Sequence, residues 1–138
     1  MCYNKHIKNK GGLKKSYDIS FRVKVEGLDN VYVEPYGDNT DANITWNVRE
    51  MIIKSTGLEN WCAEGCLGLC KDIIPHIANG LAELEKHPEK YKQYESPNGW
   101  GTVKGLKHFF AWIINDWTSY CEDYSTENLA DVTYFYIC

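Results

Sequence analysis

Long apolar runs are missing from this 138-residue sequence. No stretch approaches the roughly 20 residues that a membrane-spanning helix needs, and the N-terminus has no apolar segment of signal-peptide length. We therefore expect a cytoplasmic protein that does not act at a membrane. In that compartment cysteines are normally reduced thiols, and we expect this of all six. They are Cys2, Cys62, Cys66, Cys70, Cys121 and Cys138.

An excess of basic residues is also missing, because the formal net charge is −4. The sequence has neither a basic helix nor an RNA-binding aromatic motif, so we do not expect it to bind nucleic acid. It has no nucleophile elbow, no phosphate-binding glycine loop and no dinucleotide fingerprint. None of the four histidines, His6, His76, His87 and His108, belongs to a metal-binding pair. The sequence thus indicates no catalytic residue, metal or cofactor, and it favours a binding protein over an enzyme.

Aromatic residues, in contrast, are plentiful, with five tryptophans and ten tyrosines. Such rings either fill the core of an α+β domain or lie at an interface, where they stack on flat ligands or pack against a partner. Basic residues outnumber acidic ones near the N-terminus, and Gly11-Gly12 interrupts that stretch. We expect residues 1–16 to form a flexible basic arm and residues 17–138 to form a single α+β domain.

Alternating apolar and polar residues predict strands at both ends of the domain. The first strand begins at Asp18, and a turn at Gly27 leads to a second strand over residues 31–36, so the two should form an antiparallel hairpin. A third strand over residues 131–138 should pair with this hairpin.

Three helices are expected between these strands. The first begins within residues 42–48 and ends at Gly57, and the second carries an apolar stripe from Ile73 to Leu84. The third runs to about Cys121, and the Thr102 hydroxyl can cap its first turn. Its apolar stripe is Val103, Leu106, Phe110, Ile113, Trp117 and Tyr120. The resulting order, β-β-α-α-α-β, predicts a three-stranded antiparallel sheet with three helices packed on one face.

Cys62, Cys66 and Cys70 recur every four residues and would share one face of a helix. Thiolates are good ligands for soft metals, so a cysteine-based metalloprotein is one alternative. A zinc site would normally use two cysteine pairs, each with a two-residue spacer, and this pattern is absent. The other interpretation is that small apolar thiols simply pack in the core.

Polar and aromatic residues gather before two of the predicted helices. One group is Asn43, Thr45, Trp46 and Asn47, and the other is Asn98, Gly99, Trp100 and Gly101. Amides offer donors and acceptors, indoles offer stacking area, and helix N-termini favour anions. If the two helix starts lie together, they would form a pocket for a flat polar ligand or a phosphate. Alternatively, the second group only fixes a turn.

Several short motifs along the chain resemble a family of small proteins from phages, prophages and bacteria. Its members carry an N-I-T-x-N-like segment, a helix with G-L-x-x-L, a proline and a final N-G-W-G before a helix. The similarity covers about residues 40 to 121. The matching positions are Ala42–Val48, Met51, Gly57, Ile74-Pro75, Gly80-Leu81, Pro88, Tyr91 and Asn98–Gly101. The segment from Trp61 to Cys70 departs from the family pattern.

The resemblance implies a mobile-element setting and adds Tyr91 to the candidate ligand-binding residues. Small phage proteins of this kind often act by binding, so we expect an oligomeric anti-defence protein that sequesters a cyclic nucleotide or ADP-ribose derivative. The alternative is an inhibitor or interaction module that acts on a host defence protein.

Overall fold

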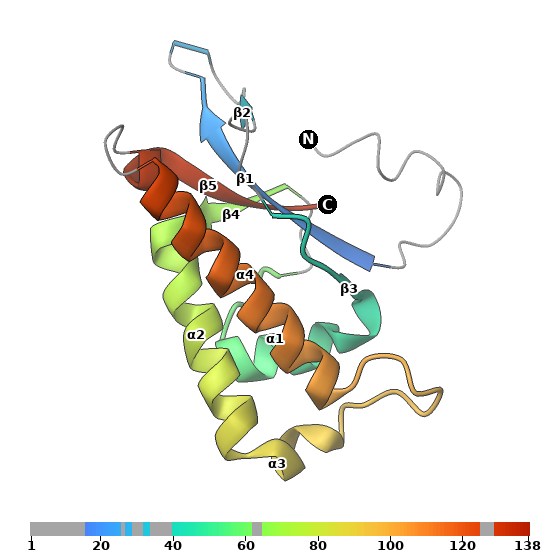
Figure 1. Ribbon diagram of the computed structural model, residues 1–138. Coiled ribbons are helices and arrows are strands. Elements are labelled where there is room, and N and C mark those ends of the chain that lie inside the picture. Colours follow the sequence, from blue (N-terminus) through green and yellow to red (C-terminus); the bar gives the residue numbers. More distant parts are fainter. Residues whose placement is uncertain (1–15, 26, 29–31, 34–39, 62–64, 125–128) are drawn as a thin grey trace, which may run out of the picture.

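The chain forms an α+β structure in which helices pack against an antiparallel sheet (Figure 1). This computed structural model describes residues 16–25, 27–28, 32–33, 40–61, 65–124 and 129–138. The predicted arm, apart from Ser16, lies outside these residues. Four strands lie side by side in the order β2 (Tyr32–Val33), β1 (Ser16–Lys24), β5 (Thr133–Ile137) and β4 (Gly65–Leu69). A short strand, β3 (Asn43–Thr45), also pairs with β1.

Strand β1, at the N-terminal end of the domain, pairs with β5 at the C-terminal end, as the alternating patterns of the two segments predicted. Phe21 lies opposite Phe135 of β5, and both side chains are fully buried on the sheet face that meets the helices. On the other face Ser20 lies opposite Tyr136, and the Arg22 guanidinium sits 4.5 Å from the centre of the Tyr136 ring. The hairpin is confirmed where β1 pairs with β2, and the remaining residues of the second predicted strand lie outside the described part.

The prediction of a three-stranded sheet was wrong because two strands were missed. Strand β3 was read as the start of a helix, but its residues are extended and Ile44 pairs with Tyr17. Strand β4 was not predicted because Gly65 and Gly68 interrupt any alternation, and it has a bulge between Cys66 and Gly68. Both strands are too short or too glycine-rich to show a clear period of two.

The first predicted helix is a 3₁₀ turn, η2 (Trp46–Val48), followed by α1 (Arg49–Thr56). It ends as predicted at Gly57, which has a φ of +79°. The chain continues through α2 (Cys70–Lys86), α3 (Pro88–Lys92), α4 (Val103–Asp123) and a 3₁₀ turn, η4 (Leu129–Val132).

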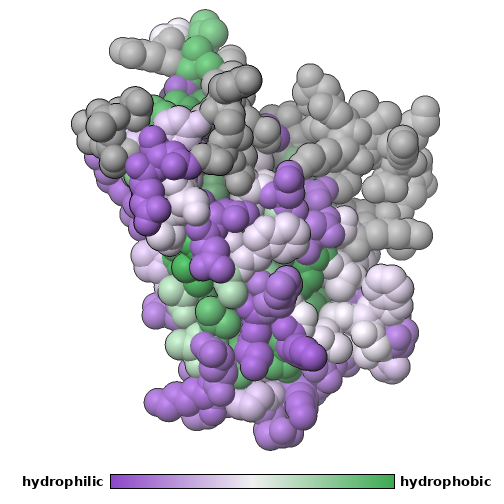
Figure 2. All heavy atoms as spheres, viewed as in Figure 1, coloured by the Kyte–Doolittle hydropathy of each residue, from purple (hydrophilic) through white to green (hydrophobic). Residues whose placement is uncertain are grey.

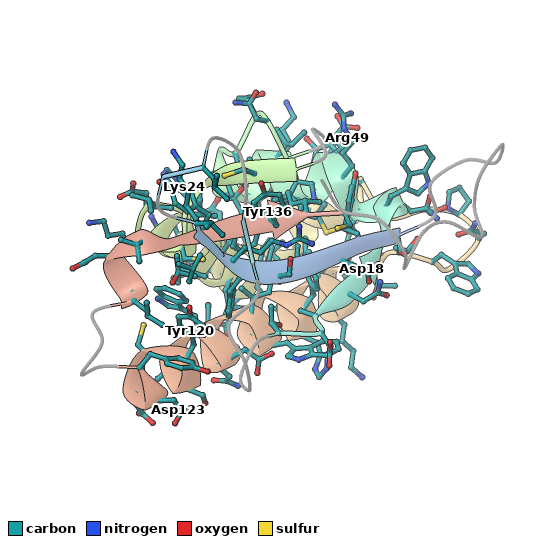
Figure 3. All side chains as sticks on the ribbon, turned by 90° about the horizontal axis from the view of Figure 1, so that it is seen from above. Asp18, Lys24, Arg49, Tyr120, Asp123 and Tyr136 are labelled. Atoms are coloured by element: carbon teal, nitrogen blue, oxygen red, sulfur yellow. The ribbon has the colours of Figure 1, made fainter. Side chains whose placement is uncertain are left out.

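Helices α1, α2 and α4 meet closely at Gly80. A Cβ atom at this position would lie 2.6 Å from Thr56 Cγ2 and 3.0 Å from Phe110 Cε2. Only glycine allows this approach, because a Cβ would force neighbouring atoms to move. Figure 3 shows α4 running along the sheet, with Tyr120 near its C-terminal end and Asp123 at that end.

The predicted apolar stripe of α4 faces the core. Its fully or almost fully buried members are Val103, Leu106, Phe110, Ile113 and Tyr120, and Trp117 is partly buried. In the described part of the chain, no helix combines the length and the apolar character that crossing a bilayer would require.

The cysteines differ from the expectation that all six are reduced thiols. Cys66, Cys70 and Cys121 are free, but Cys138 is disulfide-bonded. Cys138 is itself well fixed, since its backbone N–H donates to the Asp18 carbonyl at 2.9 Å and its carbonyl accepts from the Asp18 N–H at 3.1 Å. The expectation is therefore wrong for the last residue of the chain.

Candidate functional site

The structure brings the two polar–aromatic groups of the sequence together. Gly101, with a φ of +86°, lies directly against η2, because a Cβ atom on it would be 3.0 Å from Val48 Cγ1 and 3.2 Å from Asn47 Cβ. The loop before α4 is therefore packed on the start of the η2–α1 segment. We call the exposed residues on the two sides of this contact the tryptophan surface. They are Trp46, Asn47, Asn98, Gly99 and Trp100.

Two indoles are the dominant feature of this surface. Trp100 is 65% exposed and Trp46 is 38% exposed, whereas Trp61 is completely buried in the core. Figure 2 shows that the loop before α4 presents a mostly pale surface, which indicates residues of intermediate hydropathy, while hydrophobic residues emerge along α2 and α4. The tryptophan surface is thus aromatic and largely uncharged.

A tight turn presents Trp100 to solvent. The Gly99 N–H donates to the Ser96 carbonyl at 3.1 Å, and the Trp100 N–H donates to Asn98 Oδ1 at 2.9 Å. Gly99 has a φ of +82°, which the turn requires and glycine permits. The side-chain oxygen of Asn98 therefore stabilises the turn. This is the structural role that one of the two interpretations of the sequence gave to this group.

The start of α4 is already capped by two side chains. Thr102 Oγ1 accepts a hydrogen bond from the Gly105 N–H at 2.9 Å, as the sequence predicted, and Glu95 Oε2 accepts from the Val103 N–H at 2.8 Å. The Glu95 carboxylate also places a negative charge at the positive end of the helix dipole. A phosphate bound there would have to compete with this carboxylate, so the α4 start is a poor anion site.

The η2–α1 start uses its polar residues differently. Neither Thr45 nor Val48 caps the helix through a side chain. Thr45 is half-buried and pairs with Ser16, and the Asn43 side-chain amide donates to the Asp18 carboxylate on β1. Asn43 and Thr45 thus attach β3 to β1, while Trp46 and Asn47 remain exposed next to the α4 loop.

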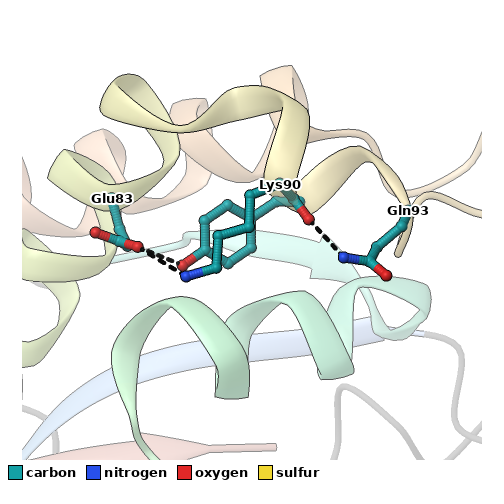
Figure 4. A network of polar contacts seen from close by, with 4 residues as sticks. Glu83, Lys90 and Gln93 are labelled. Atoms are coloured by element: carbon teal, nitrogen blue, oxygen red, sulfur yellow. Dashed lines mark hydrogen bonds and ion pairs between the residues drawn. The ribbon is translucent and has the colours of Figure 1, made fainter.

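Tyr91 does not belong to the tryptophan surface. Its ring is 1% exposed, and its hydroxyl donates to Glu83 Oε1 at 2.8 Å, so it joins α3 to α2. Figure 4 shows this network, in which Lys90 also approaches Glu83 and Gln93 donates to the Lys90 carbonyl. Burial and the nearby Glu83 raise the pKa of Tyr91 to about 12, and the Tyr91 hydrogen bond lowers the pKa of Glu83.

A second candidate region, on α4, was not predicted. A surface hollow of about 390 Å³ is lined by His108, Ala111, Trp112, Asn115 and Asp116. These positions follow helical spacing on the side of α4 opposite its buried stripe. The mixed aromatic and polar character of this second stripe is the sequence signal that could have revealed the hollow.

The described cysteines do not support a metal centre. Cys66 lies on strand β4 and Cys70 begins helix α2, so they do not share the helix face that their spacing suggested, and Cys62 lies outside the described residues. Burial raises the pKa of both the Cys66 and the Cys70 thiol, which disfavours the thiolate that a metal binds. Within the described ranges, no three His, Cys, Asp or Glu residues come together as a metal-binding group.

Comparison of the chain with protein-family models, with curated proteins and with solved structures finds no match. The similarity to small phage and bacterial proteins therefore stays a prediction from sequence motifs. The geometry of the tryptophan surface and of the α4 hollow is the basis for the functional proposals below.

Proposed function

We propose that this protein is a non-enzymatic binding protein that docks onto another protein through its tryptophan surface. The observation that carries the proposal is the exposure of Trp46 and Trp100 on two segments that are fixed to each other at Gly101. Indoles bury a large area at little cost in side-chain entropy, and they are enriched among residues that dominate binding energy. Because a turn and a glycine contact hold the surrounding backbone, little ordering would be needed on binding.

The surroundings of the two indoles favour a partner with an apolar pocket and a polar but uncharged rim. Asn47 and Asn98 are exposed beside the indoles and can hydrogen-bond at the edge of an interface. Burial of the indoles would then supply most of the affinity. We expect binding to depend only weakly on ionic strength, since few charges would be paired across the contact.

A nucleotide-derived ligand is less well supported at this surface. Its phosphate would meet a helix start already occupied by Glu95 and Thr102. The resemblance to small phage proteins instead supports a host protein as the partner, and docking would then block that host protein. A second copy of the chain is a further candidate partner, consistent with the oligomer expected from the sequence.

The first test is to identify a partner and measure its dependence on Trp100. The tagged protein is cross-linked in a bacterial lysate, the captured protein is purified, and its affinity is measured by calorimetry. Trp100→Ala should weaken binding by about thirtyfold, which corresponds to about 2 kcal/mol. Val132→Ala is a matched control, because Val132 is 44% exposed in η4, outside the tryptophan surface, and its loss should leave the affinity unchanged.

Two controls separate binding from folding. Trp100→Ala should keep the melting temperature of the wild-type protein because the side chain is largely exposed, whereas Asn98→Ala should lower it because the turn loses an acceptor. Native mass spectrometry reports self-association and bound nucleotides in the same samples. A partner that binds Trp46→Ala and Trp100→Ala as tightly as the wild type contradicts the proposal. So does stoichiometric nucleotide binding that Trp100→Ala abolishes.

A further inference from the structure

The hollow on α4 is an open surface depression with aromatic and polar lining, and none of its lining residues belongs to the tryptophan surface. His108 and Asn115 are exposed, while Ala111, Trp112 and Asp116 are half-buried. The nine residues from His108 to Asp116 span about 12 Å along the helix. With the volume of about 390 Å³, this length suits a compact organic ligand.

The end of the hollow nearer the α4 start is aromatic. The His108 and Trp112 rings have centroids 6.2 Å apart and are inclined at 54°, so they form an open corner. Ala111 also lines the hollow, and its small side chain leaves room beside the two rings. A planar heterocycle could stack on the Trp112 indole, an interaction that every base offers through its π-face.

The other end carries hydrogen-bonding groups. Asp116 supplies a carboxylate with two acceptor oxygens, and the Asn115 amide supplies both a donor and an acceptor. Guanine has neighbouring N1–H and N2–H donors beside its O6 acceptor, so it can pair with a carboxylate and an amide donor together. Adenine and cytosine present a single exocyclic amino group on that edge and match this pair less well.

We propose that the α4 hollow binds the guanine base of a nucleotide, with the base stacked on Trp112 and read by Asp116 and Asn115. Lys104 lies one turn before His108 on the same side of α4 and is exposed. The salt bridges found among the described residues do not include it. Its ammonium group can therefore pair with the phosphate at the other end of the ligand. This proposal is independent of the protein-docking function.

The test is calorimetric titration of the full chain with GMP, guanosine, IMP and AMP. IMP differs from GMP only in lacking the 2-amino group, so it should bind roughly tenfold more weakly, and AMP should bind more weakly still. Asp116→Asn should weaken GMP binding by roughly tenfold or more. Asp123→Asn, at the exposed end of the same helix, is the matched control and should leave GMP affinity unchanged.

Lys104→Ala tests the phosphate end of the site independently of the base end. It should weaken GMP binding but leave guanosine binding unchanged, because guanosine has no phosphate. Each variant should keep the helical circular dichroism and melting temperature of the wild type. The proposal is overturned if GMP shows no saturable binding at millimolar concentration. It is also overturned if GMP, IMP and AMP bind equally and Asp116→Asn changes none of them.

Discussion

The two helix starts beneath the tryptophan surface satisfy their backbone N–H groups in different ways. At α4, Thr102 and Glu95 each accept a hydrogen bond from a first-turn N–H. At the η2–α1 start, no side chain of Thr45 or Val48 does so. One start is closed by its own side chains, and the other begins directly from the short strand β3, which β1 holds in place.

This difference shows which polar residues are available for binding. Asn98, Thr102 and Glu95 are used to build the turn and the helix end, so their presence is explained by structure. Asn43 and Thr45 are likewise explained by their attachment to β1. The exposed part of the tryptophan surface, above all the two indoles, takes no part in these structural contacts. A binding function therefore depends on Trp46 and Trp100 rather than on the polar residues from which the sequence analysis predicted the site.

The largest expected effect comes from breaking the contact that joins the two starts. Gly101→Ala should destabilise the fold by about 2 to 3 kcal/mol, because the new Cβ would press on Val48 and Asn47 and the backbone has a positive φ. Gly99→Ala is the matched control, since Gly99 also has a positive φ but has no atom within 4 Å of the added Cβ. Gly99→Ala should lower the free energy of unfolding by only about 1 kcal/mol. Urea unfolding measures both, and equal losses would show that the contact contributes nothing.

A smaller effect should distinguish the capped start from the uncapped one. Thr102→Val keeps the shape of the side chain but removes the cap, so it should cost about 1 kcal/mol in the free energy of unfolding. Thr45→Val makes the same chemical change where the hydroxyl caps nothing, and valine is well suited to a strand. Its effect on urea unfolding should be close to zero. A similar loss in the two variants would contradict the difference between the starts.

Local sequence patterns predicted the elements with a long, clear period. The buried stripe of α4, the alternation of β1 and β5, the Thr102 cap and the helix end at Gly57 are all set by near neighbours in the chain. Strand β3 has only three residues and β4 contains two glycines, so neither shows a readable pattern. Their formation depends on pairing with β1 and β5, which are distant in sequence.

The candidate site was predictable in part for the same reason. The composition of the two polar–aromatic groups was visible in the sequence, but their contact depends on Gly101 meeting Asn47, more than fifty residues earlier. The Glu95 cap depends on how the loop folds back on α4, and the burial of Tyr91 depends on how α3 packs. The α4 hollow was missed because its residues were read singly rather than as a second helical stripe.

The smallest expected effect concerns Tyr91, which fixes α3 just before the loop that carries Glu95. Its hydrogen bond lowers the pKa of Glu83 in the folded state, with a smaller contribution from Lys90. A lowered folded-state pKa contributes stability above the ordinary glutamate pKa and loses it as the pH falls through the folded-state value. Tyr91→Phe should therefore have a lower melting temperature than the wild type at neutral pH, and the two should approach each other in acid. Tyr94→Phe, whose hydroxyl does not contribute to the Glu83 shift, should run parallel to the wild type throughout. If the Tyr91→Phe difference is the same at every pH, the hydroxyl contributes through packing rather than through the Glu83 charge. Tyr91 would then hold α3, and with it the loop beside the tryptophan surface, through packing of its ring alone.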